Sequence, residues 1–127
     1  MPHALIIDDN LGNINVLQHM LAQEGLTSTA IQDAAAVESR LASLPTTDVV
    51  FIDLEMPDVS GYDIFHLLKG QPAFKQARFI ACTVHTMEIH NAREIGFDSF
   101  LGKPLKGEKF SGQLAKIMAG GTVWEVR

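Results

Sequence analysis

The sequence predicts an α/β protein whose parallel sheet is covered by helices on both faces. Five short apolar runs alternate with segments whose apolar residues recur every three or four positions, the spacing of a helix. The runs are apolar throughout instead of alternating apolar with polar residues, and strands of that kind are buried on both faces. A parallel sheet between two helical layers satisfies both observations.

The five predicted strands are short runs of β-branched and other apolar residues between turn or helix signals. The run Val49-Val50-Phe51-Ile52 is the strongest strand signal in the chain. The predicted strands cover residues 4–7, 27–32, 48–53, 78–83 and 97–101.

Five segments with helical periodicity follow these strands. Three of them end at residues that commonly stop a helix, Gly25, Pro45 and Gly96. Asp33 can cap the second helix. The fourth helix is predicted over residues 87–95, and the apolar positions of the others are Ile14, Leu17 and Leu21; Val37, Leu41 and Leu44; Ile64, Leu67 and Leu68; and Phe110, Leu114, Ile117 and Met118.

The composition is that of one soluble globular domain. The chain has 127 residues, of which 46% are hydrophobic and 20% are charged. Its net charge of −5 argues against nucleic acid or an anionic membrane surface as a direct partner, because both favour a basic patch. No apolar run approaches the ~20 residues that span a bilayer. The single cysteine, Cys82, and the absence of a signal-peptide pattern after Met1 indicate a reduced, cytoplasmic protein.

We expect a single domain over residues 1–119 and a tail over residues 120–127. The tail contains the only tryptophan, Trp124. Three interpretations of the tail are open: a frayed end, a strand that docks on the domain, or the start of a linker.

Charged and hydroxyl side chains follow four of the five predicted strands. Asp8 and Asp9 come after the first strand, Asp53 ends the third, Thr83 ends the fourth, and Lys103 follows the fifth. The carboxyl ends of parallel strands form the ligand-binding edge of such a sheet, so these side chains are predicted to converge. Clustered carboxylates repel one another and favour a hard cation such as Mg²⁺. A carboxylate can also act as a nucleophile toward phosphorus, and an ammonium group can neutralise phosphoryl oxygens.

The same residues give the chain a specific resemblance to a known family. It resembles the response-regulator receiver domain of two-component signalling, in order and with similar spacing, from about Ala4 to Met118. The resemblance implies a flavodoxin-like, doubly wound five-stranded parallel sheet with five helices and the strand order 2-1-3-4-5. The motifs that carry it are Ile6-Ile7-Asp8-Asp9-Asn10, Phe51-Ile52-Asp53-Leu54-Glu55-Met56-Pro57, Ser60-Gly61, Thr83 and Lys103-Pro104.

The resemblance also implies a role for each acidic residue. Asp53 matches the phosphoacceptor. Asp9 matches a direct ligand of Mg²⁺ (or Mn²⁺), Asp8 a partly water-mediated one, and the backbone carbonyl of Glu55 would complete the protein ligands together with Asp53.

Three further residues match the family's switch and phosphoryl-binding positions. Thr83 matches the switch hydroxyl, and Lys103 matches the phosphoryl-binding lysine. Phe100 matches an aromatic side chain that turns inward when the hydroxyl moves toward the phosphoryl group. The Lys103–Pro104 bond matches a bond that is cis in the family.

Two departures from the family pattern concern the chemistry of the site. Val84 stands after Thr83 where a smaller residue is usual, and we expect it to slow phosphorylation and dephosphorylation. Phe100 replaces the commoner tyrosine and so lacks a hydroxyl. Glu55 and His85, each two residues beyond a site residue, are further candidates for tuning the rate.

The implied function is that of a stand-alone phosphoacceptor receiver of the chemotaxis or phosphorelay type. A histidine kinase or histidine phosphotransfer protein would donate phosphoryl from a phosphohistidine to Asp53, and an unidentified output protein would respond. Such a domain catalyses only its own phosphorylation and dephosphorylation, and is not otherwise an enzyme. The surface of the fourth helix, fifth strand and fifth helix would change shape for the output partner.

Two alternative functions are open. One is a protein-interaction module that does not depend on phosphorylation. The other is a Mg²⁺-dependent phosphatase of the haloacid-dehalogenase type, which also uses an aspartyl nucleophile. That type requires Asp-x-Asp, whereas the chain reads Asp53-Leu54-Glu55 and is too short for the usual cap domain.

Overall fold

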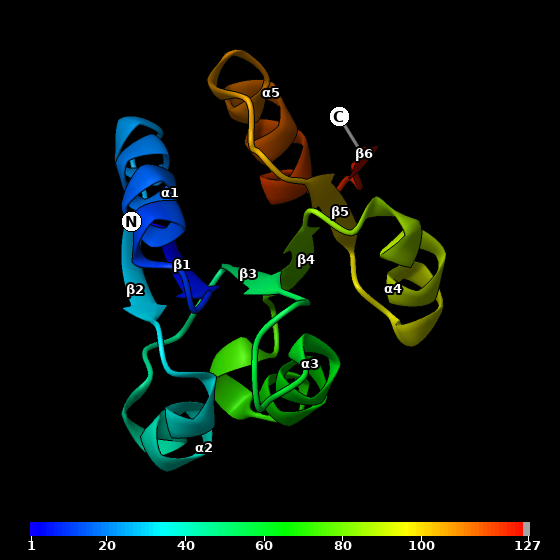
Figure 1. Ribbon diagram of the computed structural model, residues 1–127. Helices are drawn as coiled ribbons and strands as arrows, with labels where there is room; N and C mark the ends of the chain where they lie inside the picture. Colours follow the sequence, from blue (N-terminus) through cyan, green and yellow to red (C-terminus); the bar gives the residue numbers. More distant parts are fainter. Residues whose placement is uncertain (126–127) are drawn as a thin grey trace.

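A single parallel sheet runs through the middle of the molecule (Figure 1). The structure is a computed structural model that describes residues 1–125. The strand order is β2-β1-β3-β4-β5-β6, and every neighbouring pair is parallel. The strands are β1 (His3–Ile7), β2 (Thr27–Ile31), β3 (Val49–Asp53), β4 (Arg78–Thr83), β5 (Ser99–Gly102) and β6 (Trp124–Glu125).

The sheet has six strands, so the prediction of five was wrong by one strand. The additional strand, β6, lies within the predicted tail and adds to the outer edge of β5, with Phe100 opposite Trp124 and Leu101 opposite Glu125. A strand of two residues is too short to show a periodicity in the sequence. Its formation depends on contacts with distant residues. Of the three interpretations of the tail, β6 agrees with a strand that docks on the domain.

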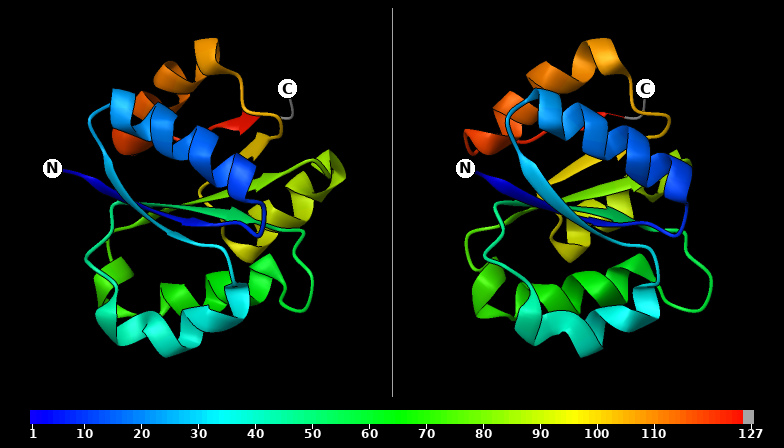
Figure 2. Two further views of the ribbon diagram at one scale, coloured as in Figure 1. Left: turned by 60° about the vertical axis from the view of Figure 1, so that its left-hand side comes forward. Right: turned by 90° about the vertical axis from the view of Figure 1, so that its left-hand side faces the viewer.

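The helices form two layers that cover opposite faces of the sheet (Figure 2). One layer contains α1 (Leu11–Gln23) and α5 (Gly107–Met118), and the other contains α2 (Val37–Arg40), α3 (Gly61–Lys69) and α4 (Ile89–Ile95). The second predicted helix is only four residues of α-helix, flanked by 3₁₀ turns at Ala34–Ala36 and Leu41–Ser43.

Successive strand residues supply the two halves of the core in turn. In β1, Leu5 and Ile7 pack under α2, α3 and α4, while Ala4 and Ile6 pack under α1 and α5. Because both faces are covered, the inner strands β1, β3 and β4 need apolar side chains on both sides, whereas the edge strand β2 is only partly buried. This is why the runs that predicted the strands are continuously apolar.

The start of β5 differs from the prediction by two residues. Phe97 follows the end of α4, and its N–H donates back to the Ala92 carbonyl of that helix at 3.1 Å. The Asp98 carboxylate accepts from the N–H of Phe79 at 2.8 Å. Both residues therefore make the turn between α4 and β5, and pairing with β4 begins at Ser99. No helix within residues 1–125 has the length and hydropathy needed to cross a membrane.

The first residue of α3, Gly61, lies directly against the end of β3. A Cβ atom at this position would be 2.5 Å from the Asp53 carbonyl oxygen and 2.8 Å from the Leu54 Cα. Both contacts are with backbone, which cannot move aside cheaply. The absence of a side chain at Gly61 thus allows α3 to begin beside the segment that carries Asp53.

We predict that Gly61→Ala lowers the free energy of unfolding by about 1–3 kcal/mol, the usual cost of overpacking. Gly112→Ala is the matched control, because nothing lies within 4 Å of a Cβ at Gly112 in α5. That variant should gain roughly 0.5–1 kcal/mol from the higher helix propensity of alanine. Urea unfolding of the three proteins measures both changes, and equal stabilities of Gly61→Ala and wild type would contradict the packing argument.

Candidate functional site

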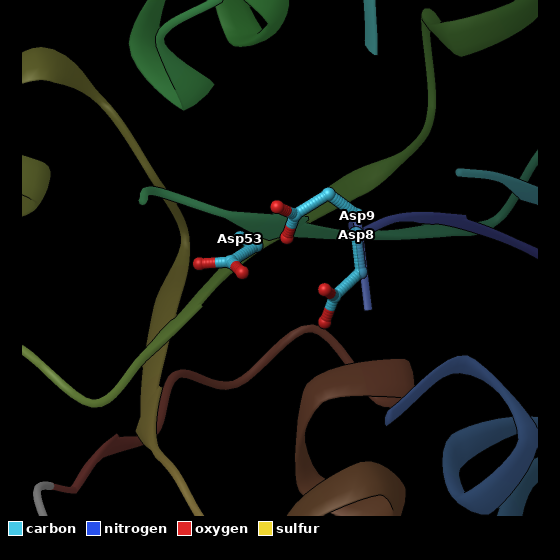
Figure 3. Close-up of side chains that lie close together, drawn as sticks. All are labelled: Asp8, Asp9 and Asp53. Atoms are coloured by element: carbon cyan, nitrogen blue, oxygen red, sulfur yellow. The ribbon is translucent and has the colours of Figure 1, made fainter. Parts of the chain in front are cut away.

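Three aspartates meet at the carboxyl end of the sheet. Asp8 and Asp9 follow β1, and Asp53 is the last residue of β3. Each offers a carboxylate oxygen that lies within 4.8 Å of the other two, and Figure 3 shows the three side chains together. Asp8 and Asp53 are buried, whereas Asp9 is exposed. Strand pairing of β1 with β3 places these residues side by side although they lie far apart in the sequence.

Lys103 lies between two of these carboxylates. Its ammonium Nζ is 2.7 Å from Asp8 Oδ2 and 3.2 Å from Asp53 Oδ2. Burial alone would lower the pKa of Lys103, but the hydrogen bond from its ammonium to Asp8 and the charges of Asp53 and Asp8 outweigh burial and raise it. Lys103 therefore stays an ammonium at neutral pH. The peptide bond between Lys103 and Pro104 is cis.

The carboxylate of Asp53 is held in a fixed orientation. Its Oδ1 accepts the backbone N–H of Glu55 at 2.9 Å, and its Oδ2 accepts from Lys103. Burial raises the pKa of this carboxyl, and the nearby Asp8 charge adds to the rise, although the Glu55 N–H and Lys103 oppose it. The environment thus orients the group and at the same time disfavours its negative charge.

Thr83 ends β4 on the other side of Asp53. It is fully buried, and its hydroxyl oxygen accepts the N–H of His85 at 3.0 Å. A hydroxyl that accepts a hydrogen bond can still donate its own proton. The Thr83 carbonyl accepts the N–H of Lys103 at 2.9 Å, so the ends of β4 and β5 are tied together next to the acidic residues.

A cavity of about 270 Å³ opens beside the acidic residues. Asp8, Asp53 and Lys103 form its polar part, and Val84 lines it from the segment after β4. The side chain of Val84 is 62% exposed. Its position beside Asp53 agrees with the expectation that it borders the reacting group. Its effect on the rate stays a prediction.

The apolar wall of this cavity was not expected from the sequence. Val16 and Leu17 of α1 and Phe51 of β3 form part of it. Val16 is 58% exposed and lies off the buried stripe of Ile14 and Leu17. In the sequence, the available signal for this wall was an apolar residue outside the helical stripe, on the helix that follows the paired aspartates.

The remaining predicted residues lie around this centre. Glu55 and His85 are both exposed, and their proposed influence on the rate stays a prediction. The Glu55 N–H holds Asp53, while the role of its carbonyl as a metal ligand is untested. Phe100 lies fully buried in β5, three residues before Lys103, within the core under α3 and α4.

One contact near the site was missed by the sequence reasoning. The Tyr62 hydroxyl of α3 donates to Glu88 Oε1 at 2.7 Å. Glu88 ends the 3₁₀ turn Thr86–Glu88 that leads from β4 to α4. Burial and this contact with Glu88 raise the pKa of Tyr62 to about 12, so the hydroxyl keeps its proton. The hydrogen bond ties the segment after Thr83 to α3.

The fold recurs in solved structures of other proteins. With 20% sequence identity, the structure aligns with the chemotaxis protein CheY4 of Vibrio cholerae at a TM-score of 0.81, over 92% of this chain and 98% of that one. A CheY-like response regulator receiver domain from Methylobacillus flagellatus is 25% identical, with a TM-score of 0.80 and coverage of 92% and 98%.

Curated relatives are similar in sequence over most of this chain. The stress response regulator protein 1 of Scheffersomyces stipitis is 34% identical over 80% of this chain and 36% of its own length. The protein of the same name from Meyerozyma guilliermondii is 33% identical over 79% and 48%. The hybrid signal transduction histidine kinase L of Dictyostelium discoideum is 26% identical over 80% and 6%. The chain thus spans less than half the length of these relatives.

The acidic cluster and the lysine that bridges two of its members lie on a segment that matches one family model. That model describes the response regulator receiver domain, and it matches residues 4–115. The chain belongs to the response regulator receiver domain family of two-component signalling.

Proposed function

We propose that this receiver accepts a phosphoryl group on Asp53 from a phosphohistidine of a partner protein, either a histidine kinase or a histidine phosphotransfer protein. The observation that carries the proposal is the fixed carboxylate of Asp53, which Glu55 N–H and the Lys103 ammonium orient at the wall of an open cavity. A carboxylate held in this way presents an oriented nucleophile to an incoming phosphorus atom.

The proposed transfer is a displacement at phosphorus. An Asp53 carboxylate oxygen attacks the phosphorus, an O–P bond forms, and the N–P bond of the phosphohistidine breaks. The imidazole leaves with the electron pair of that bond and takes up a proton. Water later attacks the phosphorus of the aspartyl phosphate, which restores the carboxylate and releases inorganic phosphate. The chain acts in this scheme only on its own Asp53.

The residues around Asp53 fit a magnesium ion. Mg²⁺ prefers hard oxygen ligands and commonly takes one or two carboxylates. The carboxylates of Asp8, Asp9 and Asp53 lie close enough to share an ion. Together with the Glu55 carbonyl they would hold Mg²⁺ or Mn²⁺. When bound, the cation neutralises negative charge on the phosphoryl oxygens.

Lys103 and Thr83 supply further contacts to the phosphoryl group. The Lys103 ammonium is 3.2 Å from the Asp53 carboxylate. As a compact positive charge, it can form an ion pair with an oxygen of the phosphoryl group on Asp53. The Thr83 hydroxyl can donate its proton to another phosphoryl oxygen. Both groups are attached to the ends of β4 and β5, so their movement connects Asp53 to the outer half of the sheet.

Exposed apolar side chains support a protein as the phosphoryl donor. Val16 and Val84 are 58% and 62% exposed, and both line the cavity that contains Asp53. Leu11, the first residue of α1, is 54% exposed. Apolar groups gathered beside a polar site are typical of a surface that another protein covers.

Because Cys82 is buried and unpaired, a reduced compartment such as the cytoplasm is the proposed location.

Asp53→Asn should abolish phosphoryl uptake, because it preserves the size of the side chain and removes the nucleophilic carboxylate. Labelled acetyl phosphate with Mg²⁺ is the donor, and protein-bound label is the measurement. Asp58→Asn is the matched control, since Asp58 is exposed and its positive φ of 70° suits asparagine. Uptake by Asp53→Asn at the wild-type rate would show that the acceptor lies elsewhere.

Mg²⁺ should raise the melting temperature, because it binds the folded site and not the unfolded chain. At ten times its dissociation constant the gain is about 1.4 kcal/mol, and Asp9→Asn should reduce it. A melting temperature of wild type that is indifferent to millimolar Mg²⁺ would count against the metal site.

Without metal, Asp53→Asn should be more stable than wild type at neutral pH. The folded-state pKa of Asp53 is raised, so its protonated form favours folding, and that contribution is lost as the pH rises through the folded-state value. The same melting curves, recorded without Mg²⁺, measure this difference. A lower melting temperature for Asp53→Asn would contradict the assigned direction of the pKa.

Val84→Ala should speed both phosphorylation by acetyl phosphate and the later loss of phosphoryl. Valine is stiff about χ1 and borders the space that a water in line with the Asp53–phosphorus bond must enter. We expect a severalfold effect, below the ~100-fold that an ångström of misplacement can cost. Val16→Ala, equally exposed on the same cavity, is the control for small donors. Equal or slower phosphoryl loss in Val84→Ala would refute the steric explanation and direct attention to Glu55 and His85.

A further inference from the structure

The strand β6 covers the edge of the sheet between α4 and α5, where the sequence predicted no strand (Figure 1). Its two flanking helices both contact it. From α4, the Arg93 guanidinium lies 4.6 Å from the centroid of the Trp124 ring. From α5, the Gln113 amide donates to the Glu125 carboxylate at 2.9 Å. The strand is thus seated on the surface that α4, β5 and α5 build together.

The chain that leads into β6 is anchored at its base. The Arg78 guanidinium donates to the carbonyl of Gly121 at 2.9 Å and to that of Gly120 at 3.3 Å. The N–H of Val123 donates to the hydroxyl of Ser99 at 3.0 Å, within the buried interior. These contacts place the approach to β6 against β4 and β5, so a movement of β5 disturbs the approach as well as β6.

The side chains around β6 extend both halves of the core. Val123 packs in the half under α1 and α5, and Trp124 packs against the half under α3 and α4. Trp124 is the register partner of Phe100, and both side chains belong to that second half. Trp124 therefore shields Phe100, which would otherwise border the open edge of the sheet and is instead fully buried.

The same elements reach the site of Asp53 by two routes. Along β5, Lys103 follows three residues after Phe100 and bonds both Asp8 and Asp53. Along the other route, Thr83 leads into the segment that begins α4, the helix that carries Arg93. A phosphoryl group on Asp53 would attract Lys103 and Thr83. Their movement would shift β5 and α4, the two elements against which β6 is placed.

We propose that β6 is a releasable cover on the α4–β5–α5 surface, and that phosphorylation of Asp53 loosens it. The proposal rests on the proposed phosphorylation of Asp53. Release costs little free energy because, within the described residues 1–125, β6 consists of two residues that pair with β5. A groove lined by Gln113, Lys116 and Trp124 separates part of β6 from α5, so the contact is not tightly packed. Loosening β6 exposes the outer edge of β5.

Hydrogen exchange of a single amide tests the release. The Phe100 N–H donates to the Val123 carbonyl at 2.7 Å, so its exchange reports the junction between β5 and the chain entering β6. Beryllofluoride with Mg²⁺ serves as the phosphoryl mimic on the full chain. We expect exchange at Phe100 to rise about fivefold or more, within the usual range of allosteric coupling. The Thr27 N–H, which bonds the Pro2 carbonyl at the opposite edge, is the control and should not change.

The reverse effect must also hold, because coupling between two sites is reciprocal. Trp124→Ala should bind beryllofluoride about fivefold more tightly than wild type, as measured by calorimetry. Gln113→Ala removes only the hydrogen bond to Glu125 and should shift the affinity less, in the same direction. Gln18→Ala is its matched control, since Gln18 of α1 makes the equivalent bond to Ser28 at the opposite edge.

The outcomes separate this proposal from the function on which it rests. Beryllofluoride that fails to bind in calorimetry would overturn both. Beryllofluoride that binds while exchange at Phe100 stays unchanged or slows would overturn the cover alone. Equal affinities of wild type, Trp124→Ala and Gln113→Ala would overturn it as well.

Discussion

The ammonium group of Lys103, placed between Asp8 and Asp53, is the interaction on which the site depends. It joins the loop after β5 to the ends of β1 and β3. Burying two carboxylates together is unfavourable unless a cation compensates for the lost solvation. Lys103 compensates only in part, since the pKa of Asp53 remains raised. With Asp9 included, three carboxylates face one ammonium, and the excess of negative charge makes the site receptive to a divalent cation.

The strand β5 connects this charged centre to the outer surface. On the side of β4, the N–H of Lys103, the residue that follows β5, donates to the Thr83 carbonyl. On the side of β6, the Ser99 hydroxyl accepts the N–H of Val123, and the Phe100 N–H donates to the Val123 carbonyl. A shift of β5 toward Asp53 therefore alters contacts on both of its sides. This arrangement gives a physical path of contiguous contacts from the acidic residues to the sheet edge, without requiring a change in the central strands.

Most of the fold and the centre of the site could be predicted from the sequence. Continuous apolar runs indicate strands buried on both faces, and the rule that parallel strands carry their ligands at the carboxyl edge brings Asp8, Asp53 and Lys103 together. What could not be predicted depends on contacts between distant segments. β6 has no periodicity of its own, and Val16 joins the cavity only because of how α1 lies on the sheet. The pairing of Phe100 with Trp124, a residue of the tail, is a further contact of this kind.

The two tasks of a receiver place opposite demands on its stability, and the strand order separates them. Accepting a phosphoryl group requires oriented groups held within a fraction of an ångström, which rigid neighbours provide. Asp53 ends β3, which pairs on both sides with other strands and is buried along its whole length. Reporting the modification requires a region whose rearrangement costs little free energy, and such regions lie where few contacts are made. β6 meets that description at the far edge. Between them lies β5, which pairs with β4 on one side and β6 on the other. In the proposed scheme, β6 responds to Lys103 and Thr83 while the strands that position Asp53 stay as they are.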